Sequence, residues 1–370
     1  MTAIPAHMKA VVLTGHGGLD KLEYRDDVPT PRAAAGEVLI RVGACGLNNT
    51  DVNTRTGWYS KTVTDGTTAE GGAGGFESVT ADAATWGAAS LVFPHVQGAD
   101  VCGRIVALGE GVGDARIGER VIVEGWLRDA DDPASREKAG YLGSERWGGY
   151  AEYVTAPAVN AFAIESGLSD AELATFPCSY STAEYMLTRA GLGAGETVLV
   201  TGASGGVGSA LVQLAKRREA TVVALAGKAK MAAVRDIGAD HVLERDVGDV
   251  QAALREATGR DSVEVVADVV GGDGFPALIE ALERGGRYVT SGAIAGPIVE
   301  LDLRTLYLHD LRFDGATVMP PGIFADLVGY IERGEVRPLL AGSYPLAKLR
   351  EAQAAFLEKR HVGNLVVIVE

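Results

Sequence analysis

Residues 196–208 read ETVLVTGASGGVG, an apolar run that ends in a glycine-rich turn. The run is typical of a buried strand, and residues 205–218 continue with helical periodicity. Ala203, Gly205 and Gly208 have the AxGxxG spacing in which the backbone approaches a pyrophosphate and the helix packs closely on its strand. Free N–H groups at the helix start would face the phosphates. We therefore expect cofactor contacts from Ala203, Ser204, Gly205, Gly206 and Val207.

The residues that follow support this interpretation. Further strands are expected at 221–227 and 263–272, with a helix over 228–238 between them. Alternation of strand and helix predicts a parallel, doubly wound sheet of the Rossmann kind. The alternative is a structural glycine-rich turn in an α/β protein that binds nothing, but the strand before the turn and the helix after it favour a dinucleotide site.

The end of the second strand bears on the choice of cofactor. A site for NAD carries an acid here to bind the ribose hydroxyls. Residues 224–230 read ALAGKAK, with no acid and with Lys228 and Lys230 close by. A lysine attracts a 2′-phosphate that an acid would repel. The pattern predicts NADPH with Lys230 in the site; the alternative is that both lysines are ordinary surface residues.

Length and composition limit the remaining possibilities. The chain has 370 residues, which predicts two domains, and its 47% hydrophobic and 22% charged residues argue against disorder. We expect no membrane segment, no secretion signal and no disulfide framework, and therefore a cytoplasmic protein. The net charge of −15 argues against a nucleic-acid partner. Residues 61–90 are rich in Gly, Thr and Ala without a period, which predicts a long surface loop or insertion.

Segments along nearly the whole chain carry a family resemblance. They are MKAVVLTG (8–15), GEVLIRVGACGLNNTDV (36–52), GADVCGRIVALGEGV (98–112), GERVIV (118–123), GGYAEYV (148–154), TGASGGVG (201–208), GGRYVTSGA (285–293) and HVGNLVVIV (361–369). In this order they resemble the medium-chain dehydrogenase/reductase superfamily, specifically its zinc-free quinone oxidoreductase-like branch. The resemblance implies an α/β protein with a GroES-like partial β-barrel catalytic domain, residues 1–160 plus 312–370. A Rossmann domain, residues 161–311, is inserted into it.

The zinc branch of this family carries Cys-Gly-x-Cys-His-Thr-Asp and Gly-His-Glu segments. In this chain Asn48 stands in place of the ligand cysteine and Ala99 in place of the ligand histidine. Only Cys178, at the third position, keeps a ligand type. Zinc requires three or four N, S or O ligands. Residues 128–147, where the family has its structural zinc lobe, contain no cysteine. The resemblance therefore implies that neither metal is bound.

The resemblance also implies roles for individual residues. Asn48 and Tyr59 would be catalytic: Asn48 would hydrogen-bond the cofactor or the substrate oxygen, and Tyr59 would donate a proton or hydrogen bond to an enolate-like oxygen. The alternatives are a turn residue at Asn48 and a packing residue at Tyr59. Thr182 would lie near the cofactor phosphates; the alternative is a helix cap. Further cofactor contacts are implied at Gly227, Gly292, Ala293 and Asn364.

Several residues beside these segments have no clear chemical role. Neither Cys102 nor His95 has a partner at a metal-ligand spacing. We expect Cys102 in the core, and His95 at the surface or lining the site. Trp58, Trp86 and Trp147 fall in or next to the atypical loops and are expected near the substrate mouth.

The expected reaction is hydride transfer from NADPH to a quinone or to the β-carbon of an α,β-unsaturated carbonyl, without zinc. Two alternatives stay open at this point: an alcohol or carbonyl dehydrogenase with Tyr59 as acid, and an NADPH-binding protein with little catalysis. We also expect a homodimer joined through the late strands of the Rossmann sheet, since an exposed edge is otherwise a liability. The sequence does not predict which small molecule is the substrate.

Overall fold

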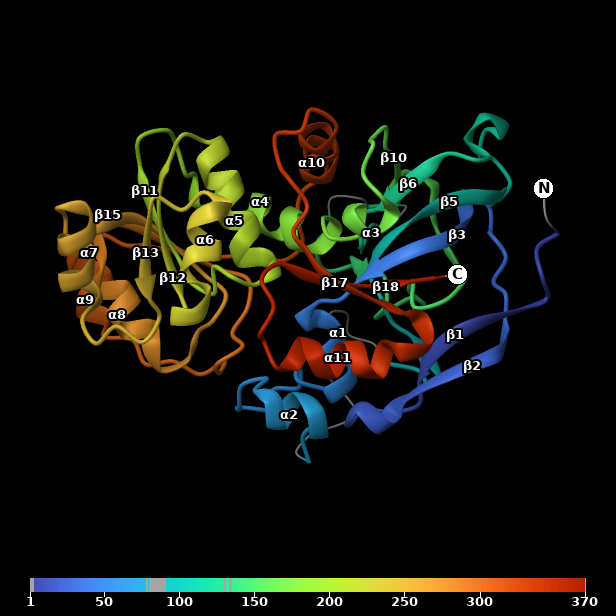
Figure 1. Cartoon of the computed structure of the whole chain (residues 1–370), viewed down its shortest axis with the longest axis horizontal. Helices are drawn as coiled ribbons and strands as arrows, with labels where there is room; N and C mark the ends of the chain where they lie inside the picture. The colour runs from blue at the N-terminus through green and yellow to red at the C-terminus, as the bar shows by residue number, and fades with distance from the viewer. Residues whose placement is uncertain (1–2, 78, 80–90, 130, 133–134, 370) are drawn as a thin grey trace.

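The chain folds into two lobes, each built around its own main sheet (Figure 1). The N-terminal segments and the red C-terminal segments share one lobe, and the yellow and orange middle segments form the other. This arrangement confirms the predicted α/β class with one domain inserted into another. The computed structural model describes residues 3–77, 79, 91–129, 131–132 and 135–369.

The middle lobe contains a parallel sheet. Its strands are β11 (Thr197–Val200), β12 (Thr221–Ala226), β13 (His241–Glu244), β14 (Val263–Asp268), β15 (Leu282–Thr290) and β16 (Arg312–Gly315). Their order is β13-β12-β11-β14-β15-β16 with all neighbours parallel. The order reverses between β11 and β14, which makes the carboxyl ends of these strands the usual ligand position in an open α/β sheet.

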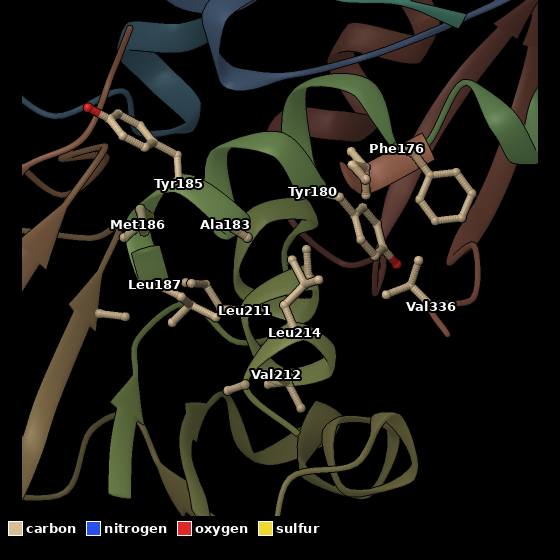
Figure 2. Packing of buried hydrophobic residues seen from close by; sticks show 14 of the residues in the cluster. Phe176, Tyr180, Ala183, Tyr185, Met186, Leu187, Leu211, Val212, Leu214 and Val336 are labelled. Carbon is tan, nitrogen blue, oxygen red and sulfur yellow. The ribbon is translucent and has the colours of Figure 1, made fainter. Parts of the chain in front are cut away.

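Helices cover the two faces of this sheet. They are α4 (Pro177–Ala190), α5 (Gly206–Arg217), α6 (Met231–Ile237), α7 (Val250–Thr258), α8 (Phe275–Glu280) and α9 (Leu303–Leu308). Helix α4 begins with Pro177 and ends at Gly191, whose φ of 65° suits glycine. Figure 2 shows the buried side chains of α4 packed against Leu211 and Leu214 of α5. This packing holds the start of α4 close to the glycine-rich turn.

The other lobe contains a mostly antiparallel sheet. Its strands are β3 (Glu37–Gly46), β5 (Asp100–Leu108), β6 (Arg120–Val123), β9 (Tyr153–Pro157), β10 (Ala161–Ala163), β17 (Leu340–Pro345) and β18 (Asn364–Ile368). Strand β18 pairs antiparallel with β3, so the C-terminal tail completes the N-terminal lobe as expected. By sheet membership, β10 belongs to this lobe and β16 to the middle lobe. The domain boundaries at 160 and 311 otherwise stay predictions.

Smaller elements complete the first lobe. They are β1 (His7–Leu13), β2 (Leu22–Pro29), β4 (His95–Val96), the hairpin β7 (Trp126–Leu127) and β8 (Gly140–Tyr141), and the helices α1 (Asn49–Thr56), α2 (Ala69–Gly74), α3 (Asp170–Leu173), α10 (Ile323–Glu332) and α11 (Leu349–Leu357). Within 61–90, expected to be a long surface loop or an insertion, residues 69–74 form the helix α2.

Tertiary contacts explain this helix in a glycine-rich segment. The buried Arg55 guanidinium donates to the carbonyls of Gly72 and Gly17. Helix propensity depends only on local residue types, so it does not include these tertiary contacts. Among the described residues no helix is both long and apolar enough to cross a membrane.

Candidate active site

The glycine-rich turn lies at the carboxyl end of β11, as the sequence predicts. Gly202 has a φ of 56°, a conformation that favours glycine. A Cβ on Gly208 would lie 2.8 Å from the Cα of Ala203, so this glycine allows the close packing that was expected. Ala203 is buried, whereas residues 204–207 keep partial exposure at the start of α5. The N–H of Gly205 donates to the Gly202 carbonyl at 2.9 Å, whereas the N–H groups of Ser204, Gly206 and Val207 can meet an anion at this helix N-terminus.

Two lysines lie beside this turn. The Nζ of Lys230 lies 3.5 Å from the Ser204 hydroxyl and also donates to the carbonyl of Lys359. The Nζ of Lys359 donates to the Asn49 side chain at 2.9 Å. Burial lowers the pKa of Lys359 to about 7, and the nearby charge of Lys230 adds to the effect. Lys228, by contrast, is exposed.

Sequence reasoning missed Lys359, although Lys359 and Arg360 stand just before the final strand. Its backbone φ of 50° is uncommon for a residue other than glycine, and such conformations concentrate at functional positions. No carboxylate forms an ion pair with Lys230 or Lys359 within the part of the chain that the structure describes. Two neighbouring cations of this kind can receive a phosphate.

Asn48 lies at the start of α1 and is held by internal hydrogen bonds. Its Nδ2 donates to Oδ2 of the buried Asp100 at 2.9 Å, and its Oδ1 accepts from the Ser179 hydroxyl at 3.4 Å. Its backbone N–H donates to Asp51 at 2.8 Å, so it also serves as the helix N-cap residue. Asn48 is 8% exposed, which leaves a small surface for a cofactor or substrate.

Asp100 forms the centre of this network. Its second oxygen accepts from the backbone N–H of Cys178 at 2.9 Å. Burial, with the charge of the neighbouring Asp51 acting in the same direction, raises the pKa of Asp100 to about 7. Burial likewise raises the pKa of Asp51 to about 6. Sequence reasoning treated Asp100 only as part of an altered zinc segment and missed its place in the network.

Cys178 lies in the first turn of α4, and hydroxyls surround its thiol. Side chains of Tyr141 and Thr182 hydrogen-bond to it. Burial raises the pKa of this thiol, and the charge of Asp100 acts in the same direction, so the group stays protonated. Thr182 is the sixth residue of α4, so the alternative of a helix cap at Thr182 is wrong. Its contact with the cofactor phosphates stays a prediction.

Tyr59 lies just after α1, next to Trp58, with the two ring centroids 5.7 Å apart. Its hydroxyl accepts from the Asn53 side chain at 3.4 Å. Burial raises the pKa of Tyr59, with a smaller contribution from the field of Cys178. The phenol is therefore neutral at physiological pH and is chemically able to donate a hydrogen bond or a proton. Its catalytic role stays a prediction.

Three of the remaining expected cofactor residues lie at the carboxyl ends of middle-lobe strands, and the fourth lies in the other lobe. Gly227 follows β12, and Gly292 and Ala293 follow β15. Asn364 lies on β18, where it accepts from Ser179 at 2.9 Å and donates to the Thr175 carbonyl at 3.3 Å. Both ends of this amide are thus engaged within the protein. Their contacts with a cofactor stay predictions.

The residues without a clear chemical role are mostly structural. Cys102 is buried in the core, as expected. His95 is 4% exposed, so the surface alternative is wrong, while the alternative that it lines the site stays a prediction; burial lowers its pKa to about 4. Trp58 and Trp147 are partly exposed, while Trp86 lies outside the described residues.

Comparison with known proteins places this geometry in a family. The family model described as "Alcohol dehydrogenase GroES-like domain" matches residues 34–166, and "Zinc-binding dehydrogenase" matches residues 206–333. A solved structure described as a putative alcohol dehydrogenase from Sinorhizobium meliloti 1021 is 50% identical, with a TM-score of 0.90. The match covers 100% of this chain and 99% of that one. The chain belongs to the medium-chain dehydrogenase/reductase superfamily.

Curated relatives include a reductase and an oxidoreductase that match nearly the whole chain. Acryloyl-coenzyme A reductase of Metallosphaera sedula is 28% identical over 97% of this chain and 99% of its own length. NADPH-dependent alkenal/one oxidoreductase, chloroplastic, of Arabidopsis thaliana is 27% identical over 99% of this chain and 80% of its own length. These similarities support an oxidoreductase that uses a nicotinamide cofactor.

The name of one matching family model implies a zinc site. The residues that stand at the ligand positions of the zinc branch in this chain do not fit a zinc ion. Asn48 and Ala99 supply no thiolate or imidazole, and the Asp100 oxygens accept from an amide and a backbone N–H. Cys178 keeps its proton. Across the described ranges, no group of three His, Cys, Asp or Glu side chains is arranged to hold a metal ion. Zinc requires deprotonated ligands in tetrahedral arrangement.

Proposed function

We propose that this protein is an NADPH-dependent, zinc-independent reductase of quinones or of α,β-unsaturated carbonyl compounds. The observation that carries the proposal is the hydrogen bond from Asn48 Nδ2 to Asp100. Asn48 stands where the resembled zinc branch has a ligand, and its amide gives the Asp100 carboxylate a hydrogen-bond donor in place of a cation. Loss of a metal removes a Lewis acid that alcohol oxidation uses, whereas conjugate reduction spreads the developing charge over several atoms.

The preference for NADPH is supported by the lysine pair. The Nζ of Lys230 lies next to Ser204 and that of Lys359 next to Asn49, and neither has a carboxylate partner in the described residues. A 2′-phosphate carries up to two negative charges and would relieve the repulsion between the two ammonium groups. The name of the Arabidopsis relative, which includes NADPH, agrees with this choice.

The chemistry divides between cofactor and protein. A nicotinamide cofactor held here would supply a hydride to the β-carbon of the acceptor, and the electron pair of the double bond would move to the carbonyl oxygen. Residues 204–207 and the lysines would hold the cofactor phosphates, and Tyr59 would donate a hydrogen bond to the oxygen. Because burial raises the pKa of Tyr59, the phenol keeps its proton for this task. Water completes the reaction by protonating the α-carbon.

The test is turnover by the purified chain after dialysis against a chelator. We expect NADPH oxidation with 9,10-phenanthrenequinone or an unsaturated aldehyde, no stimulation by added zinc, and no stoichiometric zinc by elemental analysis. About one zinc per chain after dialysis, with activity that follows the metal content, would contradict the proposal.

Alcohol or carbonyl interconversion is the second candidate, supported by the description of the 50% identical structure. Faster turnover of a simple ketone or alcohol than of the matching enone would favour it. A chain that binds NADPH but turns over none of these compounds would instead favour a binding protein with little catalysis.

A further inference from the structure

A buried carboxylate that the proposed reaction does not use lies at the end of β14. Asp268 has no exposed surface. Its Oδ1 accepts from the Thr201 hydroxyl at 2.5 Å, and its Oδ2 accepts from the Tyr288 hydroxyl at 2.6 Å. Thr201 begins the glycine-rich turn after β11, and Tyr288 lies on β15. One side chain therefore ties together the ends of three neighbouring strands.

The same carboxylate organises the loop that follows β14. The backbone N–H of Val270 donates to Oδ1 at 2.8 Å, and that of Gly271 donates to Oδ2 at 3.1 Å. The N–H of Val269 donates to the Thr201 hydroxyl at 3.1 Å, and this hydroxyl in turn donates to Asp268. The hydroxyl therefore links Val269 to the carboxylate. All three residues of the loop thus depend on Asp268, directly or through one hydroxyl.

This loop in turn contacts the loop that follows β15. The N–H of Ala295 donates to the Val270 carbonyl at 2.9 Å, and the N–H of Gly272 donates to the Gly296 carbonyl at 3.1 Å. Gly292 approaches the backbone of Val269. The two loops therefore form one unit at the carboxyl ends of β14 and β15, on the opposite side of the switch point from Lys230.

We propose that Asp268 is a positioning residue for the nicotinamide half of the cofactor site. The inference rests on the nicotinamide cofactor of the proposed function. A dinucleotide crosses the carboxyl edge of the sheet at the switch point, with one mononucleotide over each half. Lys230 and Ser204 mark the phosphate-bearing adenosine side beyond β12. The two loops held by Asp268 then border the nicotinamide side.

The arrangement is unusual for a purely stabilising group. A buried carboxylate carries a desolvation cost, and apolar packing generally stabilises a core better than buried charge does. All the recorded donors to Asp268 come from the turn, the loop and β15. The two oxygens of a carboxylate accept about four such bonds, whereas an amide has one accepting oxygen and its NH₂ group only donates. Its chemistry is therefore matched to holding this loop in one conformation.

The experiment compares two ligands on the full-length chain. NADPH reports both halves of the site, whereas 2′,5′-ADP reports the adenosine half alone. For Asp268→Asn we expect the NADPH dissociation constant to rise about tenfold, as for loss of one well-formed hydrogen bond, while that of 2′,5′-ADP stays within twofold. We also expect the emission shift of bound NADPH to diminish, because it reports the surroundings of the nicotinamide ring.

A second pair of variants keeps the test decisive if Asp268→Asn does not fold. Thr201→Val removes the relaying hydroxyl at nearly constant volume, and Thr201→Ser retains it. We expect Thr201→Val to weaken NADPH selectively and Thr201→Ser to restore the wild-type ratio of the two dissociation constants. Equal weakening of both ligands, or no weakening of either, would overturn the inference.

Failure of the proposed function is separable from failure of this inference. If the wild-type chain binds NADPH but reduces no quinone or enone, the proposed function fails, and the two dissociation constants still decide the role of Asp268. If the wild-type chain binds no nicotinamide dinucleotide, both are overturned.

Discussion

Individual side chains near the glycine-rich turn differ sharply in environment although they are close in sequence. Lys228 and Lys230 are separated by one residue, yet Lys228 is exposed while Lys230 reaches Ser204 and the backbone of Lys359. The pattern of charges alone does not distinguish them. Their different environments make them a matched pair for testing the cofactor preference.

We predict that Lys230→Ala weakens NADPH binding by about 10- to 150-fold, which corresponds to the ~1.5–3 kcal/mol of a charge-assisted hydrogen bond. NADH binding should change little, because NADH lacks the 2′-phosphate. Fluorescence titration with both cofactors measures the effect. Lys228→Ala is the control and should leave both dissociation constants unchanged. An equal loss in the two lysine variants would mean that only general surface charge matters.

A second prediction concerns pH and follows from Lys359, whose pKa lies at about 7. A bound phosphate favours the charged ammonium, so binding takes up a proton when the free chain holds the neutral amine. NADPH affinity should therefore rise as pH falls from 9 towards 7, approaching tenfold per unit, and level off below 7. The phosphate itself titrates near pH 6, so measurements stop at about 6.5.

The controls for this pH dependence are NADH and the Lys359→Gln variant. Neither should show the slope, because one lacks the phosphate and the other lacks the titrating amine. The same slope for NADH and NADPH would assign the proton uptake to a different group.

We predict that Tyr59→Phe lowers kcat for conjugated carbonyl substrates by about 100-fold or more, as loss of one hydrogen-bond donor to a developing oxyanion does, while NADPH affinity stays nearly unchanged. Tyr180→Phe is a suitable control, since this buried phenol binds the Arg337 carbonyl and Gln213 instead. Steady-state kinetics and NADPH titration test both variants. A decrease below threefold would make Tyr59 a lining residue, and collapse of cofactor binding would make it structural.

At the scale of elements, the segment from β11 into α5 contains two glycines that are required for different physical reasons. A Cβ on Gly208 would collide with Ala203 of the same turn, whereas a Cβ on Gly205 would have its nearest neighbour 3.5 Å away. Gly205 also has extended backbone angles that any residue adopts. The protein itself therefore requires glycine at 208, while a ligand would require it at 205.

We predict that Gly208→Ala lowers the free energy of unfolding by about 1–3 kcal/mol, as overpacking does. Gly205→Ala should keep the stability of the free chain and raise the NADPH dissociation constant at least tenfold, because its methyl group occupies the space next to the pyrophosphate. Thermal unfolding and cofactor titration separate the two effects. Unchanged cofactor binding in Gly205→Ala would contradict a phosphate at this turn.

At the scale of the whole molecule, the middle lobe presents an apolar surface beside its last strand. Strand β16 lies at the end of the sheet order, next to β15. On and before α9, Ile298, Leu303 and Tyr307 are 69%, 65% and 62% exposed. Exposed apolar patches and open strand edges commonly mark contacts between subunits.

We propose that a second copy of this chain covers this surface, so that the protein is a homodimer at micromolar concentration. Leu303→Glu should shift the sedimentation coefficient towards that of a monomer, because a carboxylate is costly to bury in such an interface. Val159→Glu, at an exposed apolar residue of the other lobe, is the control and should leave the dimer intact. A wild-type monomer in sedimentation would refute the proposal.

Much of this protein follows from local sequence. The glycine-rich turn, the strand before it and the helix after it form one continuous segment, and their periodicity and spacing are physical requirements of a dinucleotide-binding fold. The replacement of metal ligands by Asn48 and Ala99 is likewise visible residue by residue, as is the switch from a barrel-like pattern to alternating strands and helices. In these cases the residues that carry the signal and the structure that they predict lie within a few positions of each other.

Only the tertiary structure decided which side chains share an environment. Lys359 joins Lys230 across 129 residues, and Asn48 meets Asp100 across 52. Asp268 meets Thr201 across 67. The lysine pair depends on how the C-terminal segment returns to the rest of the chain. Asn48 meets Asp100 because β3 pairs with β5, and Asp268 meets Thr201 because β14 lies next to β11 in the parallel sheet. Burial then changes the chemistry of these groups, as it does for the amine of Lys359 and the carboxyl of Asp100. Desolvation depends on the packing of the whole chain, so residue type and spacing alone do not determine it.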